Sequence, residues 1–464
     1  MIEDEFILTK SQSELQIKLD KFLKSSDRIF LIEGPPGTGK TTVNKITLKE
    51  YIDADIKTNA KGSGINIAGI TLAHAAKNIL GKHIPNVFTF ASAYGMKETF
   101  NDDGSRSFVF NSYQETIPIG HCSLPVFVHD EVSQYNTDMI KIMLEKTPIF
   151  SKIILIGDKA QLPPIEPKES RRAVDSDSAI FDLDLPESCK HTLTEIVRQK
   201  EGNPILELSR FIRKEIFGSQ NIVKVLEELR VPKIKDGIGY SHVNYGNDLY
   251  EHIESRNYLD TAVIAFRKKT VGFFNSEIRN YLLKNPEENI IKNDIICMLD
   301  NYYHKTEGKF KEIEYVLHNS DVFKIDKVFV KNIKHYINNK LYKTEVYSAS
   351  LVNEKTKRVI IPTEVGIVQL EKSLEYLAKL CNARKLKWHF YWEFRKRFCN
   401  CSYGYAITAY KCQGSTYKSV YIDINDILMT GPLSTKRKLQ TIYTAMTRAS
   451  EDVYFLTQRN YGSS

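Results

Sequence analysis

The stretch Gly34-Pro35-Pro36-Gly37-Thr38-Gly39-Lys40-Thr41 directly follows an apolar run at residues 29–32. It matches the pattern G-x-x-x-x-G-K-[ST], and its context predicts a strand over 28–33 and a helix over 41–51. Glycines let successive N–H groups turn toward phosphate oxygens, and the helix start adds positive potential. Lys40 can then bind the β- and γ-phosphates, and the Thr41 hydroxyl can complete the coordination shell of a Mg²⁺ ion. Because a bare glycine turn needs no Gly-Lys-Thr at a strand-to-helix junction, the sequence predicts a nucleoside-triphosphate site.

The chain has 464 residues, which predicts roughly two to four domains. Its formal charge of +8 is compatible with a polyanionic partner but does not identify one. No apolar run reaches the ~18 residues of a membrane span, and the acidic start at residues 1–5 is unlike a signal peptide. The seven cysteines lack zinc spacing, since Cys399 and Cys401 have no second pair nearby. We therefore expect a cytoplasmic protein with reduced thiols.

Apolar runs alternate with helical patterns in the first part of the chain, which is typical of a parallel α/β sheet. The expected strands are 28–33, 64–71, 124–129 and 152–157, and the expected helices are 11–23, 73–80 and 138–145. Turn residues at 101–105, between aromatic arms, predict a β-hairpin.

A second α/β pattern begins with a strand at 261–266 and a helix at 269–283. It resumes after Tyr403 with a strand at 419–424 and a helix–strand unit ending near 456. Between these parts the segment 285–402 predicts a mostly β insertion, with strands at 323–330, 345–352 and 358–361 and an aromatic-basic helix at 388–398.

Polar groups follow two of the predicted strands. An apolar run at 126–128 leads into Asp130 and Glu131. Downstream of a phosphate loop, this pair predicts Mg²⁺ binding by Asp130 and polarisation of the attacking water by Glu131; alone it would more often be a solvated strand end. The next strand ends at Gly157-Asp158, and Gln161 follows where it can contact the γ-phosphate or that water.

Together these segments resemble superfamily 1 helicases. Further resemblances are a Q motif at 8–12, motif Ia at 71–76, an arginine-finger segment at 193–199, motif V at 405–416 and motif VI at 443–449. Their order is most similar to the 5′→3′ branch, superfamily 1B, with its Dda-like, RecD-like and Pif1-like members. Motif Ia departs from the pattern with Leu72-Ala73 in place of Pro-Thr, and motif V has Tyr410 where His is usual. Neither departure removes a catalytic group.

The resemblance implies an α/β fold with two RecA-like P-loop motor domains, a small β-hairpin pin and a mostly β, SH3-like insertion. The expected boundaries are 1–96 and 123–190 for motor domain 1A, 97–122 for the pin, 191–284 and 403–464 for motor domain 2A, and 285–402 for the insertion.

It also implies residue roles. The expected nucleotide contacts are Gln12, which reads adenine, then Gly34, Pro35, Pro36, Gly37, Thr38, Gly39, Lys40, Thr41, Thr42, Asp130, Gln413 and Gly414. The expected catalytic set is Lys40, Glu131, Gln161 and the two arginine fingers Arg198 and Arg448, with Mg²⁺ on Thr41 and Asp130. The expected single-strand contacts are His74, Phe90, Phe100, Phe108, Thr408, Tyr410 and Lys411.

Several of these residues have structural alternatives. Outside its motif, His74 would be a packing residue. The hairpin carrying Phe100 and Phe108 is equally well explained as a surface hairpin with core aromatics. Trp388 and Trp392, spaced i,i+4, are expected to be packing residues that clamp the insertion onto the pin rather than residues that stack on bases.

The implied function is an ATP-dependent 5′→3′ DNA helicase of replication or recombination, using ATP and Mg²⁺. Its expected partners are single-stranded DNA and single/double-strand junctions, with a single-strand-binding protein as a further candidate. We expect a monomer, and a phage is the candidate source. The alternatives are a translocase that displaces proteins or acts on RNA without unwinding, and a nucleotide-gated single-strand-binding switch. A switch has no need of two arginine fingers.

Overall fold

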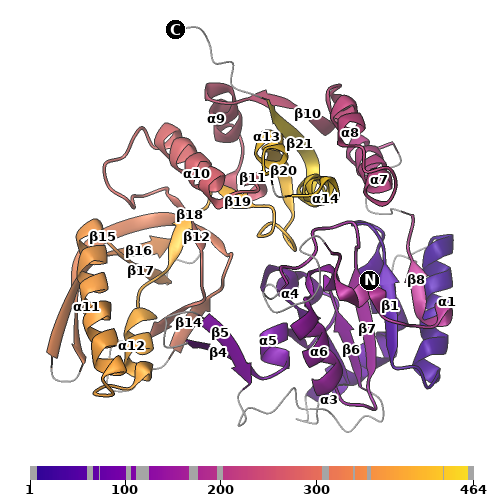
Figure 1. The fold of residues 1–464 in the computed structure, drawn as a ribbon, viewed down its shortest axis with the longest axis horizontal. Helices are drawn as coiled ribbons and strands as arrows, with labels where there is room; N and C mark the ends of the chain where they lie inside the picture. Colours follow the sequence, from indigo (N-terminus) through magenta and orange to yellow (C-terminus); the bar gives the residue numbers. More distant parts are fainter. Residues whose placement is uncertain are drawn as a thin grey trace. The chain divides into compact units, whose positions relative to one another are not determined.

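The computed structural model describes residues 8–59, 66–72, 74–100, 106–110, 125–166, 176–195, 202–305, 313–337, 340–352, 357–431 and 433–457 (Figure 1). By its backbone contacts the chain divides into two compact units. The first comprises the described parts of Met1–Thr99, Phe108–Val243 and Cys412–Thr457. The second comprises those of Phe100–Ser107 and Asn244–Lys411.

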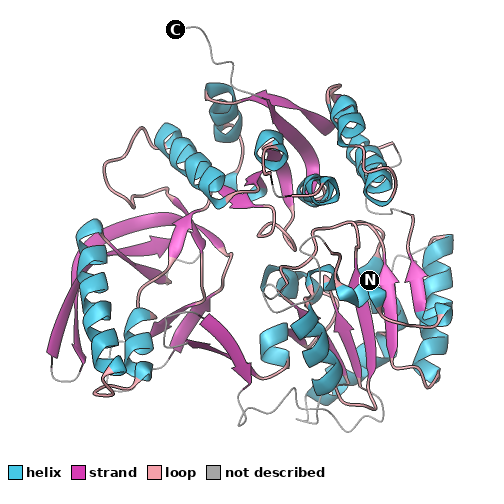
Figure 2. Ribbon diagram, viewed as in Figure 1, coloured by secondary structure: helices cyan, strands magenta, loops and turns pink. Residues whose placement is uncertain are grey.

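A parallel six-stranded sheet forms the centre of the N-terminal part, in the order β3-β2-β6-β7-β1-β8. Its strands are β1 (Ile29–Glu33), β2 (Ile67–Thr71), β3 (Val87–Thr89), β6 (Val126–His129), β7 (Lys152–Gly157) and β8 (Lys190–Thr192). The α-helices around it are α1 (Lys10–Lys24), α2 (Lys40–Thr47), α3 (Lys49–Asn59), α4 (His74–Leu80), α5 (Phe90–Ala93) and α6 (Thr137–Lys146). Figure 2 shows helices on both sides of this sheet.

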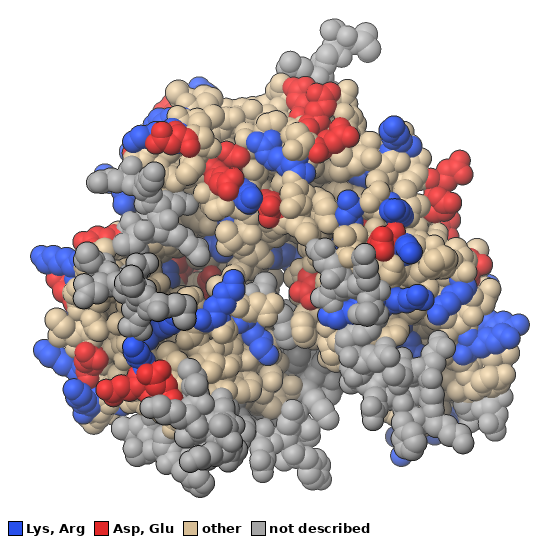
Figure 3. Space-filling model, turned by 180° about the vertical axis from the view of Figure 1, so that it is seen from behind, with Lys and Arg blue, Asp and Glu red and all other residues tan. Residues whose placement is uncertain are grey.

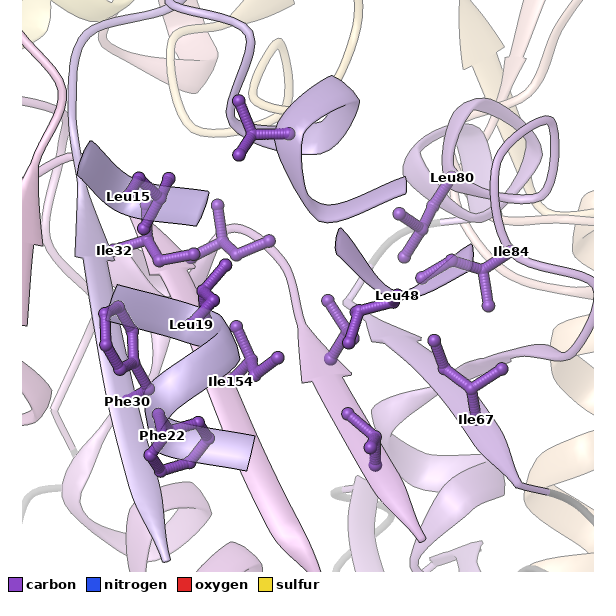
Figure 4. Packing of buried hydrophobic residues seen from close by; sticks show 14 of the residues in the cluster. Leu15, Leu19, Phe22, Phe30, Ile32, Leu48, Ile67, Leu80, Ile84 and Ile154 are labelled. Carbon is purple, nitrogen blue, oxygen red and sulfur yellow. The ribbon is translucent and has the colours of Figure 1, made fainter. Parts of the chain in front are cut away.

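Alternate residues of the buried strands supply two separate cores, because successive side chains in a strand point to opposite faces. Phe30 and Ile32 of β1 pack in the cluster that contains Leu15, Leu19 and Phe22 of α1 (Figure 4). The intervening residue of β1, Leu31, belongs to a second cluster that includes Tyr135 and residues of α6. The carboxyl ends of the strands are thus held between two packed layers.

The second sheet has the order β19-β11-β20-β21-β10-β9. Its strands are β9 (Lys233–Lys235), β10 (Ile238–Asn244), β11 (Thr261–Ala265), β19 (Ala406–Thr408), β20 (Tyr417–Ile422) and β21 (Ala449–Thr457). The helices of this region are α7 (Pro204–Phe217), α8 (Ile222–Leu229), α9 (Asn247–Glu254), α10 (Lys268–Leu282), α13 (Ile424–Leu428) and α14 (Thr435–Met446). The pairs β11–β19 and β20–β21 are parallel.

An antiparallel sheet, β17-β16-β15-β12-β18, forms the insertion. Its strands are β12 (Ile295–Met298), β15 (Val322–Ile337), β16 (Lys340–Leu351), β17 (Arg358–Pro362) and β18 (Cys401–Tyr403), beside the separate pair β13 (Tyr302–Lys305) and β14 (Ile313–Leu317). Two helices pack on it, α11 (Glu364–Asn382) and α12 (Trp388–Arg395). Trp392 is buried and its ring stacks with that of Trp388, in keeping with a packing role.

The structure corrects three sequence-based expectations. The helix expected over 41–51 is two helices that meet at Leu48, and the β-branched residues along this stretch weaken a continuous helix. The insertion has the predicted mostly β character, but it also contains a helix that was not predicted, the 19-residue α11, which is capped by Thr363 and packs on the sheet. The strand expected at 419–424 lies at Tyr417–Ile422.

The predicted hairpin is present as the two-stranded sheet of β4 (Met96–Phe100) and β5 (Arg106–Phe110). Cys122 lies outside the described residues, and the other six cysteines are free thiols. No helix in the part of the chain that the structure describes is long and apolar enough to cross a bilayer.

Candidate active site

The phosphate loop connects β1 to α2 as the sequence predicts. Gly37 and Gly39 have φ values of 83° and 76°, in the left-handed region that glycine adopts at little cost. The Thr38 hydroxyl donates a hydrogen bond to the carbonyl of Pro35 at 3.0 Å. Lys40 Nζ donates to the carbonyls of Gly34 at 2.7 Å and Pro35 at 2.9 Å. These bonds fix the curl of the loop and hold the ammonium group beside it.

Gln12 supports the loop from α1. Its side chain is fully buried and its Nε2 donates to the carbonyl of Thr38 at 2.9 Å. Its Oε1 accepts from the backbone N–H of Thr9 at 3.0 Å, which completes a capping box at the start of α1. Both ends of the amide are thus engaged with protein, and Gln12 does not line the cavity described below. Adenine recognition by Gln12 stays a prediction.

Asp130 and Glu131 stand where β6 ends. Glu131 has a φ of 55°, an uncommon left-handed conformation for a residue with a side chain. Its backbone N–H donates to Asp130 Oδ1 at 2.9 Å. Burial, and next the neighbouring Glu131 carboxylate, raise the pKa of Asp130 to about 6. The local turn therefore keeps two carboxyl groups together at one strand end.

Lys40 faces these carboxylates across a desolvated site. Burial lowers the pKa of Lys40, and the negative charges of Asp158, Glu131 and Asp130 oppose that shift. A half-buried ammonium group beside carboxylates can accommodate phosphate oxygens and a divalent cation together.

Most of the residues predicted to bind the nucleotide line one cavity of about 370 Å³. Its lining comes from the phosphate loop, the ends of β6 and β7, α4 and the two C-terminal motif segments. The lining residues are Pro36, Gly37, Gly39, Lys40, Thr41, Thr42, Ala76, Ile79, His83, Asp130, Glu131, Gly157, Asp158, Gln161, Gly414, Ser415, Thr416, Thr447 and Arg448. All of them belong to the first compact unit.

Arg448 enters this cavity directly after α14. Its side chain is 5% exposed, Nε donates to the carbonyl of Thr444 at 3.2 Å, and Nη2 donates to Thr447 Oγ1 at 3.3 Å. Its position is thus set by the helix end that carries it. Arg198, the other predicted finger, lies outside the described residues.

The loop after β7 is tied to the C-terminal motifs by two hydrogen bonds. The N–H of Leu162 donates to Thr444 Oγ1 at 2.9 Å, and Gln413 Nε2 donates to the carbonyl of Leu162 at 3.1 Å. Gln413, predicted to contact the nucleotide, is thus a support for this loop and is not among the cavity residues. Gln161 lies on the same loop, and no hydrogen-bond partner for its buried Oε1 occurs among the described residues.

Thr41 and Asp130 supply the oxygen ligands that Mg²⁺ prefers when it also binds phosphates. No group of three His, Cys, Asp or Glu side chains suited to a metal occurs in the described ranges. One carboxylate and one hydroxyl in an open cavity fit an ion that completes its shell with phosphate oxygens and water.

The predicted single-strand contacts have diverse settings. Phe90 is 4% exposed and packs on Tyr94 and Tyr135 with ring centroids 4.7 and 5.2 Å away, so it belongs to the core and offers no face to a base. His74 begins α4, and Phe100 and Phe108 lie on β4 and β5; the side chains of all three lie outside the described parts.

The remaining three predicted single-strand contacts, Thr408, Tyr410 and Lys411, lie in motif V. Thr408 ends β19, and its Oγ1 accepts from the N–H of Lys411 at 3.3 Å. Tyr410 is half-buried, with its ring 6.2 Å from that of Phe266. Lys411 is also half-buried.

Sequence reasoning missed three residues that the structure joins to this site: Asp158, Arg213 and Tyr443. The first signal was available, since Asp158 follows an apolar strand as Asp130 does. Arg213 follows the buried Ser209 by one turn of α7, so helical spacing could have placed it beside the buried face. Tyr443 is the first residue of motif VI, and nothing in the sequence besides the motif indicates its bond to Asp158.

Two family models and several known proteins match this chain. A family model described as an AAA domain matches residues 8–229, and one described as a UvrD-like helicase C-terminal domain matches residues 403–456. The ATP-dependent DNA helicase dda of Enterobacteria phage T4 is 27% identical over 479 residues, spanning 97% of this chain and 99% of its own. The RecBCD enzyme subunit RecD of Buchnera aphidicola is 22% identical over 480 residues, spanning 94% of this chain and 74% of its own.

Among solved structures, a Pif1 helicase from Bacteroides in complex with ADP-AlF3 and single-stranded DNA aligns with a TM-score of 0.46 and 16% identity, covering 97% of this chain and 92% of that one. The two family models lie where the phosphate loop and motifs V and VI lie, and the relatives match nearly the whole chain. The chain is therefore similar, over nearly its whole length, to ATP-dependent DNA helicases of superfamily 1B, the group that includes phage T4 Dda and RecD.

Proposed function

We propose that this protein is an ATP-driven motor that moves 5′→3′ along single-stranded DNA and unwinds duplex ahead of it, in DNA replication or recombination. One observation carries the proposal. A single cavity holds the phosphate-loop lysine, a carboxylate pair, a buried glutamine and an arginine that comes from the far end of the chain. This set suits phosphoryl transfer to water, in which positioning and charge stabilisation do most of the work.

Each residue has a role in hydrolysis. Lys40 and the loop N–H groups bind the β- and γ-phosphates, and Glu131 orients and deprotonates the attacking water. Gln161 contacts the γ-phosphate or that water through its amide. Arg448 offsets charge that develops on the transferred phosphoryl group, and we propose Arg198 as a second arginine for the same task. A Mg²⁺ ion on Thr41 and Asp130 would supply positive charge to the phosphate oxygens.

The strand contacts are proposed from motif V and from the hairpin. Thr408, Tyr410 and Lys411 combine a hydroxyl, an aromatic ring and a cation, the groups with which proteins bind single strands irrespective of sequence. His74 is a further candidate contact. On the face seen in Figure 3, lysines and arginines are interspersed with acidic residues rather than gathered into one continuous basic patch. We therefore expect recognition to depend on stacking and local contacts as well as on net charge.

The hairpin of β4 and β5 is the proposed wedge that separates strands at a junction. We propose that the protein acts as a monomer, with a single-strand-binding protein as a candidate partner. Deleting the hairpin is expected to abolish unwinding while ATP hydrolysis continues. If unwinding persisted in that variant, the wedge assignment would be wrong.

Two assays test the motor. ATP hydrolysis is measured with and without a single-stranded DNA oligonucleotide, and strong stimulation is expected. Unwinding is then measured on duplexes that carry either a 5′ or a 3′ overhang. Activity on the 5′ overhang alone supports the proposed polarity, and activity on the 3′ overhang alone would refute it.

The alternatives give different outcomes in the same assays. A translocase that strips proteins would displace streptavidin from a biotinylated strand without separating duplex, and an RNA motor would be stimulated by RNA rather than DNA. A nucleotide-gated binding switch would bind single strands in an ATP-dependent way with slow hydrolysis that DNA does not stimulate.

A further inference from the structure

A charged cluster lies at the wall of the active-site cavity, which one of its members, Asp158, lines. Asp158 follows β7, Arg213 lies on α7 and Tyr443 lies on α14. The Tyr443 hydroxyl donates to Asp158 Oδ2 at 2.8 Å, and Arg213 Nη1 pairs with Asp158 Oδ1 and reaches the Tyr443 oxygen at 3.4 Å. The Asp158 side chain is 0% exposed and that of Arg213 is 19% exposed.

The charges in this cluster are compensated within it. Burial alone would lower the pKa of Arg213, but the Asp158 carboxylate and the Tyr443 hydroxyl outweigh burial, so the pKa is raised. Burial, and next Asp158, raise the pKa of Tyr443 well above its usual value. The arginine thus stays a cation and the tyrosine a hydrogen-bond donor, and the three groups act as one fixed unit.

One side of the cluster leads to Gln161. Asp158 Oδ1 accepts from the N–H of Ala160 at 3.0 Å, and the Asp158 carbonyl accepts from the N–H of Gln161 at 3.0 Å. The turn that carries the glutamine is therefore built on the aspartate that Arg213 holds. The glutamine amide faces the cavity with its buried Oε1 unbonded within the described chain.

The other side leads to Arg448. Tyr443 precedes it by five residues on the segment that ends α14. The residue after the tyrosine, Thr444, accepts from the N–H of Leu162 and, through its carbonyl, from Arg448 Nε. The register of this helix end on the Gln161 loop thus sets the place of the arginine. Arg213 contacts Asp158 on the loop and Tyr443 on the helix, and it does not line the cavity itself.

We propose that Arg213 is a positioning residue for ATP hydrolysis, which holds Gln161 and Arg448 in register by bonding Asp158 and Tyr443 at once. The inference rests on the proposed ATPase function and adds to it a residue that does not line the active-site cavity. Both contacts come from Nη1, whose two N–H groups can serve the Asp158 and Tyr443 oxygens at the same time.

The test uses the full-length protein with saturating oligo(dT), and the variants Arg213→Ala, Arg213→Lys and Tyr443→Phe. Arg210→Ala is the matched control, because Arg210 is exposed on the same helix. We expect Arg213→Ala to lower kcat about 30-fold or more with KM for ATP within about 3-fold. Affinity for ADP with aluminium fluoride should fall with kcat, while affinity for ADP alone is kept. A loss confined to transition-state binding would not arise from general loosening of the fold.

The milder variants grade the effect. Tyr443→Phe removes one hydroxyl and should lower kcat about 5–10-fold, with no further loss when it is added to Arg213→Ala. Arg213→Lys should recover part of the activity lost in Arg213→Ala. Arg210→Ala should match the wild type.

Two results would overturn the inference: an Arg213→Ala protein with near wild-type kcat, or one in which ADP affinity falls as steeply as kcat. If Arg213→Ala does not fold, an unchanged kcat in Tyr443→Phe overturns it equally. A wild-type protein and Arg210→Ala control that both fail to hydrolyse ATP would instead refute the proposed function and the inference with it.

Discussion

Two neighbouring strands of the first sheet end in an acid at the same edge, and the two acids have different surroundings. β6 leads to Asp130 and Glu131, which, like Asp158 after β7, line the cavity and act on Lys40 by their charge. β7 leads to Asp158, whose side chain is 0% exposed and bonds Arg213 and Tyr443. The first carboxylates stay available for a metal ion and water, whereas the second is fully used by the protein. The same local signal, an apolar strand followed by an acid, thus serves chemistry in one strand and positioning in the next.

The largest effect on the rate of ATP hydrolysis is expected at Arg448, which lines the same cavity as Asp130 and Glu131. Arg448→Ala should lower the rate of hydrolysis by about 10³–10⁵-fold, because a comparable arginine stabilises charge only in the transition state. ATP binding, measured with a fluorescent analogue, should change little. Arg230→Ala, at an exposed arginine, serves as the control. Near-normal turnover in Arg448→Ala would show that the cavity works without this residue; the same substitution at Arg198 tests the second proposed finger.

The next effect concerns the carboxylate that we assign to the attacking water. Glu131→Gln keeps the shape of the side chain and should slow single-turnover hydrolysis by about 10²–10⁴-fold, while ATP still binds. The control is Glu145→Gln, an exposed acid of α6 with a side chain 57% exposed. If Glu131→Gln and Glu145→Gln hydrolysed ATP equally fast, Glu131 would have no role in activating water. The proposed contrast between a catalytic acid after β6 and a positioning acid after β7 would then fail.

Asp158→Asn is expected to act on stability first. Removing the carboxylate leaves the largely buried Arg213 without its counterion, which should cost about 2–3 kcal/mol and lower Tm by roughly 2–5 °C. The measurement is thermal unfolding without nucleotide, with the exposed Asp184→Asn as the control. An unchanged Tm would mean that the bonds of Asp158 to Arg213 and Tyr443 do not stabilise the fold, which contradicts the positioning role.

Asp130→Asn should change stability with the opposite sign, and only at pH values where the wild-type carboxylate is charged. Burial and Glu131 raise the pKa of Asp130 from 3.8 to about 6, so its charged form is disfavoured in the folded protein. The penalty is present in full above about pH 6 and disappears as the pH falls toward 4. In EDTA, the variant should melt a few degrees above wild type at pH 7.5, with the difference closing below pH 6. A difference that does not depend on pH would contradict this account.

Much of the site was predictable from sequence because its signals are local. The phosphate loop needs eight consecutive residues of defined conformation, and β1 and β7 were bounded to within one residue by their apolar runs. Errors arose where burial depends on distant neighbours. Phe90 directly follows β3, and its ring is enclosed by Tyr94 and Tyr135. Gln12 matches a base-reading motif, yet its amide is engaged by Thr38 and Thr9.

The sequence by itself determined that the chain has a phosphate loop, a carboxylate pair after a buried strand, and the motif order of a helicase. These features depend on backbone preferences and side-chain types within a few residues of each other. Only the tertiary structure decided that Arg448 shares a cavity with Lys40, and that Arg213 and Tyr443 close on Asp158. Such contacts join residues as far as 285 positions apart, as Tyr443 and Asp158 are, and they follow from the packing of helices rather than from any short pattern. Whether an acid after a strand binds a metal or holds an arginine depends on what packs against it.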